Sequence, residues 1–155
     1  MEHMVQELYS AETQALDAMP QLMERARNKQ LRQAFQLHQT QTEQQVQRLE
    51  QIADQLGIDP EGDTCVAMQG LIEEVQDLLD QVEDSQVADA AIIGAAQKME
   101  HFEIAAYGTA RTLAQQAGKN EIADLLEQTL QEEKQTDEKL TTIATSSVNQ
   151  QAVQS

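Results

Sequence analysis

This sequence has a single cysteine, Cys65, two prolines, six glycines and no tryptophan among its 155 residues. One cysteine cannot form an intrachain disulfide, so an oxidising compartment is not implied. Aromatic residues make up only 3% of the chain, and alanine and glutamine are abundant. This composition disfavours a β-sandwich and favours helices that pack through small and aliphatic side chains. At this length we expect one domain with a single core.

Positive charge is also scarce, because ten lysines and arginines stand against 27 aspartates and glutamates, for a net charge of −17. A surface of this sign repels phosphate, so we expect no nucleic-acid binding and no attachment to anionic membranes. No stretch is apolar enough to span a bilayer, and the N-terminal MEHMVQELYS lacks the features of a signal peptide. We therefore expect a cytoplasmic protein.

Apolar residues recur every three or four positions in five segments, as on the buried faces of helices. The four long segments form two hairpins, and a linker of about 30 residues, long enough to run along a bundle, joins them and carries the short segment. The pattern predicts an all-α, ferritin-like four-helix bundle with a long crossover and a short fifth helix. Pro20 should kink the first helix. The predicted helices span residues 2–28, 30–56, 65–82, 86–117 and 120–145, with a break at 83–85.

The domain is expected to cover residues 1–145. The remaining residues, SSVNQQAVQS at 146–155, are polar and small, so we expect a flexible, frayed tail.

Acidic residues occupy positions on these stripes where an apolar residue is expected. They are Glu12, Glu103 and Glu133, and His38 takes such a position on the second helix. Glu100 lies one turn before Glu103 and borders the same stripe. A buried carboxylate is costly unless it is protonated or paired, so several acids that face one core indicate bound cations. We predict a metal site formed by Glu12, His38, Glu100, Glu103 and Glu133.

The heights of these residues along the bundle are not equal. Glu103 and Glu133 lie about fifteen residues on either side of one turn, so at ~1.5 Å per residue they should face each other. The same count places Glu12 near the level of Gln45 and His38 ~10 Å below it. His38 is therefore either a ligand or a group that orients one.

Carboxylates with one imidazole suit iron or manganese better than zinc, which prefers cysteine and histidine. Bridging carboxylates could hold two ions, but the chain lacks the Glu-x-x-His motif of many di-iron and di-manganese bundles. The site is thus expected to hold one or two ions. Tyr9 and Tyr107 lie one turn from Glu12 and Glu103, where they either hydrogen-bond at the site or fill the core. No catalytic residue can be named.

Five stretches of the chain carry a family resemblance: LYSAETQALDAMPQL, HQTQTEQQVQRLEQI, CVAMQGLIEEV, MEHFEIAAYGTARTLAQQAG and LQEEKQTDEKL. Over residues 4–143 the chain resembles the YciE/YciF family of ferritin-like bacterial stress proteins. The resemblance implies a rubrerythrin-like fold, a homodimer and metal in the bundle. It matches the family's conserved acids to Glu12, Glu100, Glu103 and Glu133, and its histidine to His38. Gln41 and Gln45 replace the Glu and His that other members carry at these positions.

Two functions are compatible with these features. The first is a metal protein of the stress response that handles iron or peroxide at a di-iron or di-manganese type centre. The second is a non-catalytic helical dimer, a structural or interaction protein whose metal site is vestigial. In the second case threonine, glutamine or Arg111 would cap the buried acids. Glu132, Asp137 and His101 are expected on the solvated face, and Cys65 in the core.

Overall fold

Helices make up almost all of the computed structural model, which describes residues 1–82 and 86–154. A short π-helical stretch, η1 (Ala144–Val148), and a last turn, α6 (Asn149–Ala152), follow the fifth long helix. The five main helices are α1 (Glu2–Arg25), α2 (Lys29–Leu56), α3 (Val66–Gln81), α4 (Gln86–Gln116) and α5 (Asn120–Ile143).

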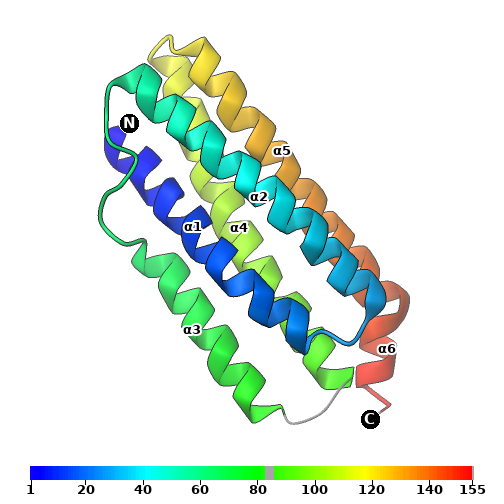
Figure 1. The fold of residues 1–155 in the computed structure, drawn as a ribbon. Helices are drawn as coiled ribbons and strands as arrows, with labels where there is room; N and C mark the ends of the chain where they lie inside the picture. The colour runs from blue at the N-terminus through cyan, green and yellow to red at the C-terminus, as the bar shows by residue number, and fades with distance from the viewer. Residues whose placement is uncertain (83–85, 155) are drawn as a thin grey trace.

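The helices form a bundle of two antiparallel hairpins, α1–α2 and α4–α5 (Figure 1). The crossover that carries α3 returns the chain along the whole bundle, so α2 and α4 run in the same direction (Figure 1). Helix α3 lies on the outside and packs against α1 and α4. The predicted ferritin-like bundle with a long crossover and a short extra helix is therefore confirmed.

The helix ends follow from local chemistry. The side chain of Asn28 caps α2 by accepting hydrogen bonds from the backbone N–H groups of Gln30 and Leu31. The buried carboxylate of Asp89 on α4 accepts from the N–H groups of Arg27 and Asn28 at 2.8 and 2.9 Å. Gly57 and Gly118 adopt the left-handed conformation, with φ of 67° and 71°. Gly57 ends α2, and Gly118 lies in the turn between α4 and α5. These contacts fix both hairpin turns.

The predicted stripes on α2 and α5 are the buried faces of these helices, with Leu56 only partly covered. On α4 the apolar repeat predicts that Ala106, Ala110 and Leu113 face the core, but Leu113 is 42% exposed and Ala106 is only partly covered. The buried residues are instead Tyr107 and Ala114. A helix of 3.6 residues per turn needs steps of both three and four, and here the four-residue steps fall after Glu103 and Ala110.

Helix α1 continues past the exposed Pro20 and ends at Arg25, earlier than predicted, where the backbone of Ala26 becomes extended. The predicted break at residues 83–85 lies outside the described residues. The C-terminal segment differs from the expected frayed tail, since it is helical through Ala152 and Val148 is 1% exposed. Val148 is an apolar residue in this polar segment, and it belongs to the same core cluster as Leu31 and Ile93. Among the described residues, no helix has the length and hydropathy needed to cross a membrane.

Candidate metal centre

Four side chains from three helices converge in the middle of the bundle. His38 comes from α2, Glu100 and Glu103 from α4, and Glu133 from α5. Each offers one nitrogen or oxygen atom, and these atoms all lie within 4.8 Å of one another. His38 Nε2 is 3.1 Å from Glu100 Oε1 and 3.9 Å from Glu133 Oε2. The helical spacing of three residues puts Glu100 and Glu103 on the same face of α4.

His38 was expected ~10 Å below the level of Glu12 and Gln45, and the structure brings it to Glu100 and Glu133. That count used only the rise along the α1–α2 hairpin, whereas His38 contacts residues of α4 and α5. Because α2 and α4 run in the same direction (Figure 1), Glu100, one turn before Glu103, lies nearer to the level of His38. The long glutamate side chains cover the remaining distance.

Several carboxylate oxygens of the buried cluster have no hydrogen-bond partner. Glu100 and Glu103 are 2% exposed and Glu133 is fully buried. Glu100 Oε2, Glu103 Oε1 and both oxygens of Glu133 have no hydrogen-bond partner. Buried polar atoms are nearly always satisfied, so orphaned carboxylate oxygens that face one another fit the donor set of a cation.

The pKa values of the acids reflect the same crowding. Burial, and then the charge of Glu133, raises the pKa of Glu12 to about 8. Burial also raises the pKa of Glu100 to about 8. For Glu103, burial and the nearby Glu12 and Glu133 raise the pKa well above its usual value, and burial and Glu100 do the same for Glu133. Near neutral pH the cluster therefore needs either protons or a cation.

The imidazole of His38 is oriented for ligation through Nε2. Its Nδ1 lies 3.4 Å from Thr136 Oγ1, and the Thr136 hydroxyl donates to the backbone carbonyl of Glu132 at 3.2 Å. In the tautomer with the proton on Nδ1, the hydroxyl oxygen accepts from Nδ1–H, and the Nε2 lone pair is available to a cation between the ring and the carboxylates. A hydrogen bond of this kind orients many metal-binding histidines.

Glu12 lies beside the cluster and not within the group of four. It is 1% exposed, and its Oε1 accepts a hydrogen bond of 2.6 Å from the hydroxyl of the fully buried Tyr107. Tyr107 therefore both fills the core and hydrogen-bonds at the site, the two roles left open for it. Tyr9, in contrast, contacts Glu50 at 3.5 Å near the surface.

Sequence reasoning missed a polar network next to the cluster. Arg48 is 8% exposed, and its guanidinium donates to both carboxylate oxygens of Glu132 at 3.1 Å and to the hydroxyl of Thr129. Gln45 Nε2 also donates to Glu132 Oε2 at 3.1 Å. Glu132, expected on the solvated face, is thus half-buried and paired. The available signal was the spacing of Gln45 and Arg48 on the inner side of α2.

Arg111, one of the groups that would cap the acids in a structural protein, instead contacts Glu127 at 2.6 Å. His101 is exposed as predicted, and its Nε2 lies 3.3 Å from Asp137. Cys65 is 4% exposed and precedes α3, as expected for a packed residue. Of the five methionines expected to fill the core, those at 19, 68 and 99 are buried and those at 4 and 23 are partly covered.

A four-helix bundle of the ferritin-like class, with a buried cluster of three glutamates and one histidine, is the type of protein that these observations define. Comparison with known proteins agrees with this description. The chain belongs to the family described as "Domain of unknown function (DUF892)", which matches residues 1–153. The YciE/YciF resemblance seen in the sequence is therefore confirmed.

The alignments with related proteins cover nearly the whole chain. Protein YciF of Escherichia coli (strain K12) is 44% identical over 151 residues, which are 97% of this chain and 91% of that protein. The crystal structure of this E. coli stress protein matches with a TM-score of 0.90 over 96% of this chain and 94% of that chain. A putative structural protein of Rhodopseudomonas palustris, YcfI, is 39% identical with a TM-score of 0.88, over 90% of this chain and 89% of that chain.

A protein from Xanthomonas campestris pv. campestris has a TM-score of 0.76 over 99% of this chain and 93% of that chain, at 20% identity. At this identity the match bears on the fold alone.

Proposed function

We propose that this protein binds iron or manganese in a carboxylate-rich centre of the di-iron or di-manganese type. The observation that supports the proposal is the buried cluster of His38, Glu100, Glu103 and Glu133, with ligand atoms within 4.8 Å of one another. Several of its carboxylate oxygens have no other partner. A site made of three carboxylates and one imidazole suits Fe(II) or Mn(II), whereas zinc favours cysteine and histidine.

The four clustered residues are sufficient ligands for one ion. Glu12 would contribute to a second ion, since its charge already interacts with Glu133 and Glu103. However, Glu12 is held by Tyr107, and Gln45, where an acid or imidazole would add a ligand, bonds to Glu132. We therefore propose a first ion that binds more tightly than the second.

The likeness to an E. coli protein called a stress protein supports a role in stress, in the handling of iron or peroxide. Iron or manganese would supply one-electron redox chemistry when bound. The chain's own residues would hold the ion, exclude bulk water and keep His38 in position through Thr136. As part of this proposal the protein acts in the cytoplasm as a homodimer.

Metal uptake is the direct test. Isothermal titration of the metal-free protein with Mn(II), or with Fe(II) under argon, should show binding of one or two ions per chain. Glu133→Gln keeps the size of the side chain and removes a ligand, so it should weaken the first binding step at least about 100-fold, beyond the loss expected for a change in the outer shell.

The matched control is Glu138→Gln, an exposed position on the same helix, which should bind as the unaltered protein does. Absence of heat and of any metal in the dialysed protein would contradict the proposal. Equal losses in the two variants would show that ions bind to the acidic surface and not to the cluster.

A second candidate function is a structural dimer with a vestigial site, and the description of the R. palustris relative as a putative structural protein favours it. In that case the buried acids would only cost stability. Glu103→Leu should then raise the melting temperature by roughly 2–4 °C per kcal/mol of relieved desolvation.

Calorimetry of this variant separates the two functions when it is run with and without Mn(II). If the protein is structural, Mn(II) leaves the melting temperature unchanged, both in the unaltered chain and in the Glu103→Leu variant. A metal protein is stabilised by Mn(II) only while Glu103 is present.

A further inference from the structure

Two small cavities lie on either side of the Met99 side chain. The inner cavity, of about 10 Å³, is bounded on one side by His38, Glu100 and Glu103. The outer cavity, also about 10 Å³, lies between α1 and α3. Leu22 and Met99 line both cavities, so these two side chains lie between the candidate metal centre and the space under α3.

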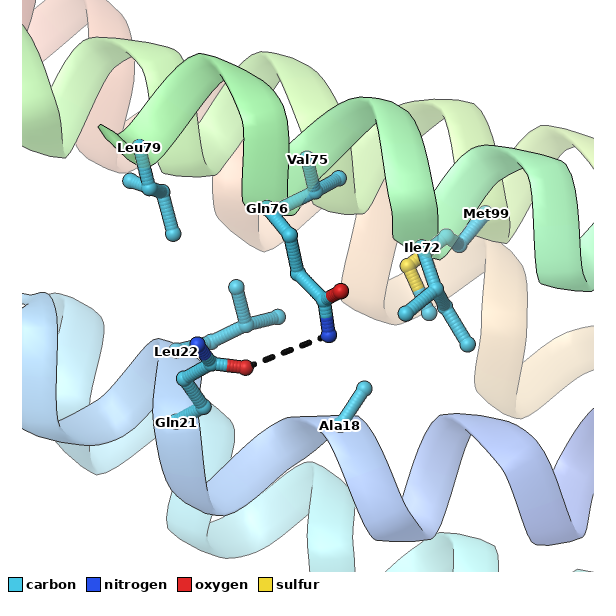
Figure 2. Close-up of a pocket in the computed structure, with 8 residues that line it drawn as sticks. All are labelled: Ala18, Gln21, Leu22, Ile72, Val75, Gln76, Leu79 and Met99. Atoms are coloured by element: carbon cyan, nitrogen blue, oxygen red, sulfur yellow. Dashed lines mark hydrogen bonds between the residues drawn. The ribbon is translucent and has the colours of Figure 1, made fainter. Parts of the chain in front are cut away.

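The outer cavity is apolar and faces a surface groove. Leu22, Ile72 and Leu79 point into the space between the two helices, with the sulfur of Met99 behind them (Figure 2). On the solvent side a hydrogen bond of 3.4 Å joins Gln76 to Gln21. Beyond it lies a groove of about 310 Å³, which shares Ala18, Gln21, Ile72 and Gln76 with the outer cavity. Groove, outer cavity and inner cavity thus form one series from solvent to the cluster.

The size and the apolar lining of these cavities determine which molecules can pass from the groove to the cluster. Each cavity is about the size of one water molecule, but water needs two to four polar partners, and the outer cavity offers mostly methyl and methylene groups. A metal ion would have to shed its hydration there without ligands, at a high cost in free energy. A small uncharged apolar molecule meets neither obstacle.

We propose that dioxygen reaches the candidate metal centre between α1 and α3, and that Met99 is the side chain that moves to connect the two cavities. Methionine is unbranched and has three rotatable side-chain bonds, so it can change conformation within a packed core more readily than Leu or Ile. The entry route rests on the proposed function for its purpose, because the centre is where the dioxygen would be used. Its existence can be tested without any metal.

Methyl NMR of the metal-free protein under argon and under dioxygen pressure tests the route, because paramagnetic dioxygen accelerates the relaxation of nearby nuclei. The methyl groups of Leu22, Val75 and Met99 should show a several-fold larger acceleration than those of Leu49 and Ile52. These two residues are at least as buried but line neither cavity. Equal acceleration at all five residues would overturn the proposal.

Ala18→Phe places a ring at the mouth of the outer cavity and should reduce the acceleration at Met99 to the level of Leu49. Ala91→Phe, a partly exposed alanine of α4 that lines neither cavity, is the control and should leave the Met99 value unchanged. Ile72→Phe on α3 serves the same purpose should Ala18→Phe fail to fold. An unchanged Met99 value in a folded blocking variant would also overturn the route. Failure of metal titration alone would leave these relaxation values unaffected, so the two proposals fail separately.

Discussion

The metal-free protein should lose stability as the pH rises from about 5 to about 8, and Mn(II) or Fe(II) should restore it. The reason is the cluster of buried acids, because the pKa of Glu12 and that of Glu100 are each raised to about 8 by burial. In the unfolded chain these groups titrate near their ordinary values, ~4.3. Between the two pKa values the folded state holds protons that the unfolded state has released.

A carboxyl group whose pKa is raised in the folded state makes the free energy of unfolding decrease as the pH rises. The folded protein has its full stability below the unfolded pKa, where both states are protonated. As the pH passes through about 8 the folded carboxyls must also ionise, and the charged form is penalised by burial. Since one pKa unit corresponds to ~1.4 kcal/mol, the total loss is on the order of several kcal/mol. A bound divalent ion replaces the protons and removes the penalty.

Urea unfolding at a series of pH values, with and without Mn(II), measures this effect. Glu103→Gln has one fewer buried acid, so its metal-free stability should fall less steeply. Glu138→Gln, which alters an exposed acid on α5, should follow the unaltered protein. Metal-free stability that stays constant or increases over this range would show that the cluster is neutralised in some other way.

Arg48→Met should destabilise the protein by about 3 kcal/mol, because removing one partner of a buried ion pair leaves the other without compensation. Burial alone would raise the pKa of Glu132, but the hydrogen bonds from Arg48 and Gln45 outweigh it, and the pKa is lowered. Glu132 is therefore charged at neutral pH, and the Glu132 side chain is only 18% exposed. The melting temperature should fall by roughly 6–12 °C for a chain of this size.

Arg111→Met is the matched control, since it breaks a pair in which the side chains of Arg111 and Glu127 are 32% and 37% exposed. Exposed pairs contribute about 0–1 kcal/mol, so the melting temperature should change by a few degrees at most. Differential scanning calorimetry of both variants makes the comparison. Similar losses in the two would mean that the Arg48 network contributes no more than a surface pair.

Periodicity was sufficient to predict the bundle, because a helix buries one face and that face must be apolar. The same rule exposed Glu12, Glu103 and Glu133 as exceptions, and all three are buried. It could not place Ala106 and Leu113 correctly, since small shifts in the choice between steps of three and four accumulate along a helix of 31 residues.

The sequence predicted that these polar residues face the core, but not which of them lie together. The count of residues along one hairpin related His38 only to Glu12, because the relative height of the other hairpin is set by the crossover. Arg48 was missed because a long basic side chain at the edge of a stripe reads as solvent-exposed. Which acid it pairs with depends on contacts between α2 and α5 that no local pattern encodes.

The separation of the candidate ligands along the chain has a further consequence. With Cys65 as the only cysteine, the chain has no covalent cross-link of its own. An ion held jointly by His38 on α2 and Glu100 on α4 would tie together segments on both sides of the crossover and close a long loop. In a chain-entropy treatment, closing a loop of this length restricts the unfolded chain by about 4 kcal/mol, as a disulfide would. The bound ion would thus be a reversible cross-link between the two hairpins, and thiol reductants, which break disulfides, would leave it intact.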